Sequence, residues 1–220
     1  MRFARQLSLA ALFAIFATVP HPCTSGEDKQ GELDARVSAF LESHRSSWHD
    51  LNIQVSDGQR LYDLVAQNGY TRTLEIGTST GHSALWIAWA LSKTGGKLIT
   101  IEIDETRYRQ ALANFKEAGL SDYIDARLAD AHGLVRSLEG PFDFVFLDAD
   151  KEWYARYFVM LRSKLAPGGC FVAHNVSKPP RAGWVVAFLA AVDAAPGFKT
   201  EIVGSQRAPM SISYYRPPQQ

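Results

Sequence analysis

Leu74-Glu75-Ile76-Gly77-Thr78-Ser79-Thr80-Gly81 is the stretch that decides the fold. The apolar run Thr73–Ile76 predicts a short strand, and His82–Lys93 predicts a helix that ends at Gly95-Gly96. Glycines in the loop between them let the backbone approach a ligand, and the N–H groups at the start of the helix face that ligand. The acidic Glu75 would repel a pyrophosphate and suits a cationic ligand. We therefore expect a strand–loop–helix unit that binds a small, positively charged cofactor.

Strands and helices alternate on both sides of this unit. Repeated β-α-β units with apolar strands favour a parallel sheet covered on both faces, and the short last connection requires an antiparallel pair. We expect an α/β, doubly wound, mostly parallel seven-stranded sheet with a C-terminal antiparallel hairpin. The further predicted strands are Lys97–Ile103, Ile124–Leu128, Phe142–Leu147, Cys170–Ala173, Phe198–Val203 and Ser211–Tyr215. The further predicted helices are 32–46, one capped by Ser56-Asp57 that runs to Asn68-Gly69, Asp104–Gly119, 131–139, Glu152–Leu165 and Trp184–Ala194.

The N-terminus differs in kind from the rest of the 220 residues. Arg2 and Arg5 precede the apolar run Leu7–Val19, and prolines follow, which is the layout of a secretory signal. We expect residues 1–25 to be a signal peptide or membrane-targeting segment, 26–31 a polar linker, and 26–220 a single domain. The protein would then be exported or membrane-associated, or cytoplasmic if the segment is not used. Equal numbers of basic and acidic residues, 23 each, favour no nucleic-acid partner.

Polar side chains also follow the later predicted strands. Glu102 ends the second strand, where a carboxylate can accept both hydroxyls of a ribose. Asp148 follows the fourth strand, and the pair His174-Asn175 follows the fifth. These three could offer a carboxylate, an imidazole and an amide oxygen to a metal ion. Lys151, three residues beyond Asp148, is placed to accept a proton from a hydroxyl group.

Taken together, Val55–Val176 resembles the cation-dependent O-methyltransferases, the catechol and caffeoyl-CoA O-methyltransferases and their bacterial relatives. The resemblance implies that S-adenosylmethionine is the cofactor and that Lys151 is the catalytic base, with Asp148 on the metal. It also implies a small-molecule hydroxyl acceptor, which is aromatic and catechol-like. We further expect a homodimer. The implied cofactor-binding residues are Ile53, Glu75, Gly77, Thr78, Gly81, Ser83, Glu102, Asp130, Ala131, Asp148 and Asp150.

One position departs from that family, whose strand-end pair is Asp-Asn where this chain has His174-Asn175. An imidazole weakens a site for Mg²⁺, while Mn²⁺, Fe²⁺ or Zn²⁺ would lose less. Two alternatives remain open: a metal ion held by Asp148, His174 and Asn175, or no metal, with His174 as the base. We expect acceptor specificity to come from the N-terminal helix and the loop Ser177–Gly183, and aromatic walls from Trp48, Trp153 and Trp184.

A second reading of the same loop is a secreted α/β serine hydrolase. Gly77-Thr78-Ser79-Thr80-Gly81 matches the G-x-S-x-G nucleophile elbow, and Asp148 and His174 follow in the hydrolase order. The elbow normally follows several earlier strands, whereas here it follows the first, and no upstream segment supplies an oxyanion loop. The sequence therefore favours the O-methyltransferase, with the hydrolase that uses Ser79 as the alternative.

Overall fold

The computed structural model describes residues 26–218, which form one α/β layer structure. The strands are β1 (Arg72–Ile76), β2 (Lys97–Glu102), β3 (Ile124–Leu128), β4 (Phe142–Leu147), β5 (Leu165–His174), β6 (Phe198–Gly204) and β7 (Pro209–Tyr215). The helices are α1 (Gly26–Ser43), α2 (Val55–Asn68), α3 (His82–Thr94), α4 (Glu105–Ala118), α5 (Ala131–Ser137), α6 (Tyr154–Leu161) and α7 (Gly183–Asp193). Short 3-10 helices, η1 (Ser121–Tyr123), η2 (Lys151–Trp153) and η3 (Arg162–Lys164), join some of them.

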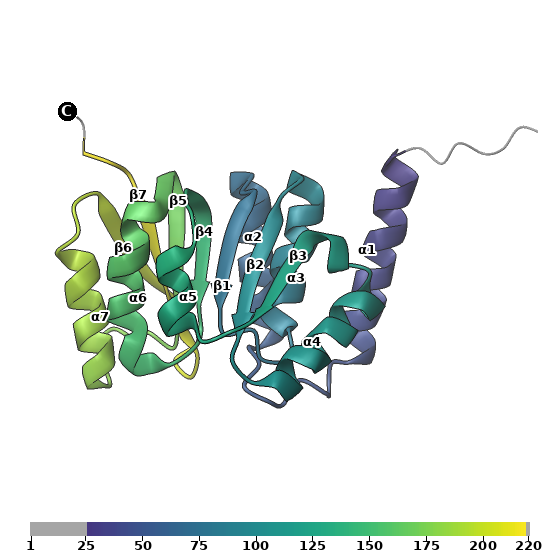
Figure 1. The fold of residues 1–220 in the computed structure, drawn as a ribbon, viewed down its shortest axis with the longest axis horizontal. Coiled ribbons are helices and arrows are strands. Elements are labelled where there is room, and N and C mark those ends of the chain that lie inside the picture. The colour runs from purple at the N-terminus through teal and green to yellow at the C-terminus, as the bar shows by residue number, and fades with distance from the viewer. Residues whose placement is uncertain (1–25, 219–220) are drawn as a thin grey trace, which may run out of the picture.

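The seven strands form one sheet in the order β3-β2-β1-β4-β5-β7-β6. The first five strands run parallel, whereas β7 pairs antiparallel with both β5 and β6. The chain starts in the middle of the sheet at β1, moves to the β3 edge and returns through β4 (Figure 1). The order therefore reverses between β1 and β4, and in open parallel sheets ligands bind at the carboxyl ends of the strands beside such a reversal.

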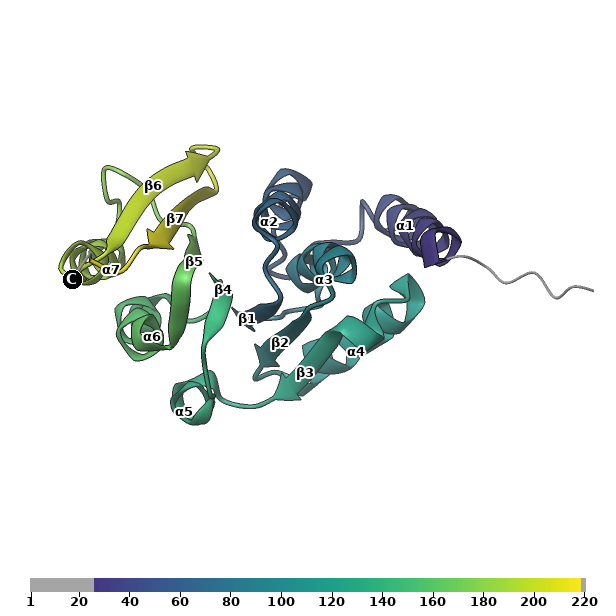
Figure 2. The same cartoon turned by 90° about the horizontal axis from the view of Figure 1, so that it is seen from above.

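Helices cover both faces of the sheet (Figure 2). One apolar cluster joins α1, α2, α3 and α4 to one face, through buried residues such as Val37, Leu61 and Phe115. The other apolar cluster joins α5, α6 and α7 to the opposite face, and its buried residues include Val135 and Phe158. Both faces are buried, which accounts for the nearly continuous apolar runs of the central strands. The predicted fold class is confirmed, and so is the antiparallel C-terminal hairpin.

Four boundary predictions are wrong, each for a local reason. Residues 26–31, predicted as a linker, form the first turns of α1. Ser56-Asp57 does not cap α2, because the N-cap is Gln54 and the helix already starts at Val55. The predicted helix Glu152–Leu165 is interrupted by 3-10 turns at both ends. The predicted strand Cys170–Ala173 is too short, because β5 runs from Leu165 through Pro167-Gly168-Gly169 to His174, and its pairing with β4 shifts register between Phe142 and Phe144.

The predicted signal or targeting segment, residues 1–25, lies outside the described residues. In the part of the chain that the structure describes, no helix is both long and apolar enough to cross a membrane.

Candidate functional site

A cavity of about 560 Å³ opens where five parallel strands end. Each strand contributes the residues that directly follow it. The lining includes Gly77 and Ser79 after β1, Glu102 and Ile103 at the end of β2, Ala129–Ala131 after β3, Asp148–Lys151 after β4, and His174 and Asn175 at the end of β5. The topology thus gathers side chains that are almost one hundred residues apart in sequence into one site.

The loop after β1 depends on its two glycines. Gly77 has a φ of 98°, and a Cβ added there would lie 2.2 Å from the backbone oxygen of Asp148. Gly81 has a φ of 97° and packs against Phe115 of α4. Both positions therefore require glycine, for conformation and for space. Gly77 lines the cavity, whereas Gly81 acts by setting the start of α3.

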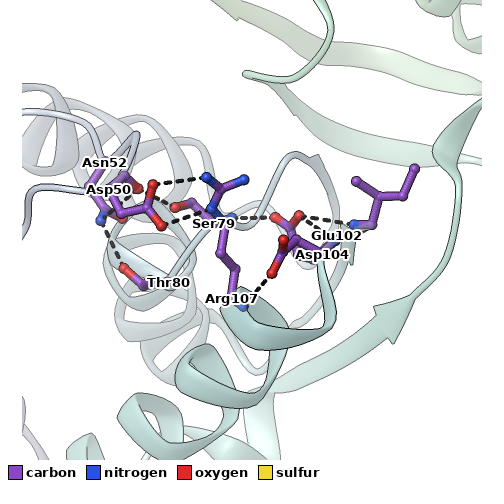
Figure 3. Close-up of polar contacts among 8 residues, drawn as sticks. Asp50, Asn52, Ser79, Thr80, Glu102, Asp104 and Arg107 are labelled. Carbon is purple, nitrogen blue, oxygen red and sulfur yellow. Dashed lines mark hydrogen bonds and ion pairs between the residues drawn. The ribbon is translucent and has the colours of Figure 1, made fainter.

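The carboxylate of Glu102 holds this loop in place through a hydrogen bond. Its Oε2 accepts a hydrogen bond of 2.7 Å from the backbone N–H of Ser79, and its Oε1 accepts bonds from the N–H groups of Ile103 and Asp104, at 3.0 and 2.9 Å. Figure 3 shows the carboxylate held between the β1 loop and the start of α4. Three backbone donors give this buried carboxylate a fixed direction. It suits the predicted role of binding ribose hydroxyls.

A segment before α2 lies over the same loop (Figure 3). Asn52 donates a 2.8 Å hydrogen bond to Thr80 Oγ1, and Arg107 of α4 pairs with both carboxylate oxygens of Asp50, at 2.8 and 3.0 Å. Leu51, Asn52 and Arg107 line the cavity beside Glu102. The predicted contact residue Ile53 is buried and does not line the cavity, and its carbonyl oxygen is bonded to His82 Nδ1 at 3.0 Å.

Glu75 lies fully buried beneath the loop. Thr100 Oγ1 donates a 2.5 Å hydrogen bond to its Oε2, and Thr78 Oγ1 lies 2.5 Å from the same threonine oxygen. Its other oxygen, Oε1, has no hydrogen-bond partner. Burial raises the pKa of Glu75 to about 8, although the hydroxyls of Ser83 and Thr100 act in the opposite direction. The acidic residue before the loop is thus a buried group that a nearby positive charge would stabilise.

The far end of the cavity is formed after β3 and β4. Asp130 caps α5 by accepting a hydrogen bond from His132 N, and Asp150 caps η2 in the same way from Glu152 N. His132 lies between these two carboxylates and stacks on Trp153 with ring centroids 3.6 Å apart. Asp130, Ala131, His132 and Asp150 all line the cavity. A flat heterocycle with polar edges would find both aromatic and acidic groups here.

Asp148 is the centre of the opposite end. Lys151 Nζ donates to Asp148 Oδ1 at 2.5 Å and to the Tyr154 hydroxyl at 2.6 Å. Burial alone would raise the pKa of the Asp148 carboxyl, but His174 and Lys151 hold it below its usual value. Asp148 is therefore an ionised carboxylate at neutral pH, with a lysine fixed on one oxygen.

His174 lies between two carboxylates. Its Nε2 is 3.2 Å from Asp57 Oδ2, and its Nδ1 is 3.1 Å from Asp148 Oδ2. The Nε2 contact has the geometry of a hydrogen bond, whereas Nδ1 is buried without a hydrogen-bond partner. Burial opposes a charge on the ring, but the two carboxylates raise the pKa of His174 to about 9. In the protein alone, the imidazole is therefore the positive partner of Asp57 and Asp148.

Most of the predicted site residues come together. Those that line the cavity are Gly77, Glu102, Asp130, Ala131, Asp148, Asp150, Lys151, His174 and Asn175. Those that do not line it are Ile53, Glu75, Thr78, Gly81 and Ser83.

Sequence reasoning missed Asp57, Arg107, Asn52 and His132. A signal for Asp57 existed, because it lies four residues before Leu61 and eight before Val65 on the apolar face of α2. A carboxylate on that face needs a partner inside the protein.

The three tryptophans predicted as walls pack elsewhere. Trp48 stacks on His82 with centroids 4.4 Å apart, Trp153 stacks on His132, and Trp184 meets Tyr154 edge-on at 5.0 Å. None of them is among the residues that line this cavity.

The hydrolase alternative finds no support in the geometry. Ser79 Oγ donates to the backbone oxygen of Asp50, and its N–H is engaged by Glu102. Both nitrogens of His174 face carboxylates, so no serine–histidine contact forms. A nucleophilic serine needs a base within hydrogen-bond reach.

Comparison with known proteins gives one matching family model, described as O-methyltransferase, over residues 32–186. A catechol O-methyltransferase from Niastella koreensis is 38% identical over 149 residues, which cover 66% of this chain and 67% of the relative. Caffeoyl-CoA O-methyltransferase 1 from Eucalyptus globulus is 34% identical over 127 residues, 56% of this chain. This match covers 51% of the plant enzyme, about half of its length.

A solved structure is also similar in fold. The O-methyltransferase from Bacillus cereus, determined in complex with SAH, superimposes with a TM-score of 0.72 at 25% identity. The match covers 83% of this chain and 91% of that one.

Proposed function

The chain belongs to the O-methyltransferase family, and we propose that it transfers the methyl group of S-adenosylmethionine to a hydroxyl of a small aromatic, catechol-like acceptor. The single observation that carries this proposal is the cavity with two distinct ends. One end has carboxylates and an aromatic stack suited to a nucleoside, and the other has Asp148, Lys151 and His174 suited to a reacting hydroxyl.

The cofactor end fits S-adenosylmethionine in charge and shape. Glu102 would accept the ribose hydroxyls, and the region of Asp130, Ala131 and His132 would hold the adenine. The sulfonium and ammonium groups carry positive charge, which the buried Glu75 and the ionised Asp148 would stabilise. Asp150, which also lines this end, would lie beside the cofactor.

The methyl transfer needs the acceptor oxygen in line with the sulfonium methyl. The oxygen's electron pair forms the new O–C bond, and the C–S bond breaks with its pair left on sulfur, which yields S-adenosylhomocysteine. Lys151 has three N–H donors, of which Asp148 and Tyr154 take two. The remaining position on Nζ would hold the acceptor hydroxyl and, when Lys151 is neutral, would accept its proton.

We also propose, as an alternative to a metal-free site, that the acceptor end takes a divalent cation. Nδ1 of His174 is buried without a hydrogen bond, it lies 3.1 Å from Asp148 Oδ2, and Asn175 lines the same cavity. Within residues 26–218, no group of three or more His, Cys, Asp or Glu could hold a metal ion, so the amide of Asn175 would be needed as the third ligand. When bound, the cation would make a coordinated hydroxyl more acidic.

Calorimetric titration with S-adenosylhomocysteine tests the cofactor end. We expect the protein to bind it, and we expect Glu102→Gln to weaken binding about 10- to 100-fold, because hydrogen bonds to a charged group contribute about 1.5–3 kcal/mol. Glu105→Gln is the matched control, since Glu105 is exposed on α4 and pairs with Arg109. No binding by the unmodified protein would refute the proposal.

Localisation and assembly remain proposals. We infer export or membrane association from residues 1–25, and fractionation of cells that express the full chain tests it. Recovery of the chain only in the cytoplasm would contradict it.

Sedimentation of the purified protein tests the proposed homodimer, and a monomer at every concentration would contradict that proposal.

A further inference from the structure

We propose that the ion-paired side chains of Asp57, His174 and Asp148 take the place of a divalent cation at the acceptor end, so that methyl transfer needs no metal ion and the acceptor needs only one hydroxyl group. This rests on the proposed function and decides between its two alternatives for that end of the cavity. Asp148 and His174 line the cavity after β4 and at the end of β5, and Asp57 meets His174 from α2.

The ring of His174 is engaged on both sides. Nε2 lies 3.2 Å from Asp57 Oδ2 in hydrogen-bond geometry, and Nδ1 forms an ion pair of 3.1 Å with Asp148 Oδ2 that is not aligned as a hydrogen bond. A histidine binds a metal through the lone pair of a neutral ring, at about 2.0–2.1 Å for Zn²⁺. A ring that serves as the positive partner of two carboxylates does not offer such a lone pair.

The carboxylate of Asp148 is engaged on both oxygens as well. Oδ2 faces His174, and Oδ1 accepts a hydrogen bond of 2.5 Å from Lys151 Nζ. A metal ion would have to displace these cationic partners to bind the carboxylate. Separating a buried ion pair is costly, because it leaves a charge without compensation.

A third ligand is also missing from the acceptor end. Within residues 26–218, no group of three or more His, Cys, Asp or Glu could hold a metal ion. Asn175 lines the same cavity, yet in the described part of the chain its amide is bonded to neither His174 nor Asp148. The residues at the ends of β4 and β5 therefore do not fit a metal ion.

The charges at this end balance without an added ion. Asp148 has His174 on one oxygen and Lys151 on the other, where a divalent cation would bring two positive charges. Asp57, 3% exposed on the apolar face of α2, pairs with the same ring and fixes it in place. A buried carboxylate needs such a partner. The protein's own residues thus supply the positive charge that the proposed cation would bring.

The same geometry limits how the oxygens of an acceptor are held. A metal ion can orient a substrate by binding two neighbouring hydroxyl oxygens at once. Lys151 Nζ has one position left for a hydroxyl, since Asp148 and Tyr154 take its other two donors. A phenol with a single hydroxyl should therefore be methylated as well as a catechol.

Transfer of a labelled methyl group to 4-methylphenol and to 4-methylcatechol, with and without chelator, tests this directly, because the two acceptors differ by one hydroxyl. We expect transfer to both, no loss of rate with chelator, and values of kcat/KM that differ less than about tenfold, the effect of one uncharged hydrogen bond. Transfer that chelator abolishes and Mn²⁺ or Mg²⁺ restores would overturn this inference alone, and so would transfer to the catechol only. No transfer to either acceptor, with or without metal, would overturn the proposed function and this inference with it.

Titration with MnCl₂, followed by electron paramagnetic resonance of free Mn²⁺, tests the ion pair without relying on turnover. We expect the unmodified protein to leave Mn²⁺ free and His174→Asp to gain one bound Mn²⁺, which the further change Asp148→Asn should remove. His49→Asp is the matched control and should gain none, since His49 is exposed and does not line the cavity.

If His174→Asp does not fold, the double variant with Asp57→Asn takes its place, because it removes the excess negative charge beside the new carboxylate. One Mn²⁺ bound by the unmodified protein and lost in Asp148→Asn would overturn the inference. So would folded variants that gain no Mn²⁺, since His174 would then not be what excludes the metal.

Discussion

At the scale of single residues, hydrogen-bond partners distinguish the two buried carboxyl groups beside the loop after β1. Glu102 lies against three backbone N–H groups, whereas Glu75 has a neutral threonine on one oxygen and nothing on the other. The two carboxyls are neighbours in the sheet, yet they are suited to different tasks. Glu102 can accept hydrogen bonds from a ligand, and Glu75 responds to a positive charge placed nearby.

The raised pKa of Glu75 predicts how the free energy of unfolding depends on pH. In the unfolded chain its carboxyl titrates near 4.5, and in the folded protein near 8. Between these values the unfolded state releases a proton that the folded state keeps, so the folded state loses stability as pH rises. Relative to Glu75→Gln, the protein without cofactor should lose about 1.4 kcal/mol of unfolding free energy per pH unit within that window.

Urea unfolding of both proteins between about pH 5 and pH 8 measures this difference. As pH rises, the free energy of unfolding of Glu75→Gln should increasingly exceed that of the unmodified protein. A difference in unfolding free energy that stays constant across the whole pH range would show that Glu75 is ionised in the folded protein.

The sequence made the chemistry of several residues predictable because each directly follows a strand. Glu102, Asp148 and His174 all lie at strand ends, and parallel strands bring their carboxyl ends to one edge. Arg107 was not predictable in the same way, because it reaches the cavity from helix α4. Asp57 meets His174 from helix α2, and its position on an apolar face showed only that it needed a buried partner. Which side of a helix faces a site depends on how that helix packs, and local sequence leaves this open.

At the scale of elements, the junction between β1 and α3 is the most constrained part of the fold. The backbone of Gly77 touches that of Asp148, so the loops after β1 and β4 have no space between them. This contact fixes the cofactor loop relative to the acceptor end.

Gly77→Ala should therefore destabilise the protein and abolish binding of S-adenosylhomocysteine. A positive φ is strained for alanine by about 1–2 kcal/mol, and the added Cβ also collides with backbone. Gly133→Ala in α5 is the control, because a Cβ there meets nothing within 4 Å. That change should be neutral or stabilise by about 0.5–1 kcal/mol. Unfolding in guanidinium gives both values, and an unchanged midpoint for Gly77→Ala would contradict the account.

The errors in predicted boundaries have physical causes at this scale. The polar residues 26–31 contain two glycines and look like a linker, but they precede a helix whose apolar face packs on the domain. Tertiary packing then extends the helix into a segment of low intrinsic helix propensity. Similarly, the predicted strand Cys170–Ala173 leaves out Pro167-Gly168-Gly169, although strand β5 continues through these residues.

At the scale of the whole molecule, the order of strands explains how one cavity could serve both halves of the proposed reaction. β1 and β2 deliver the residues proposed to bind the cofactor, β4 and β5 deliver Asp148 and His174, and the chain reverses between β1 and β4. The fold class was predictable from alternating apolar segments, and so was the antiparallel hairpin. The loop Ser177–Gly183 and helix α1 remain the predicted sources of acceptor specificity.

The central claim is that the chain moves a methyl group from sulfur to oxygen. The most direct measurement is transfer of an isotope-labelled methyl from S-adenosylmethionine to catechol, followed by mass spectrometry, with MnCl₂, with MgCl₂ and with chelator. We predict label on a catechol oxygen and an equal amount of S-adenosylhomocysteine in at least the Mn²⁺ reaction. Binding of S-adenosylhomocysteine without label on catechol or any other phenolic acceptor, in any of the three conditions, would contradict the account.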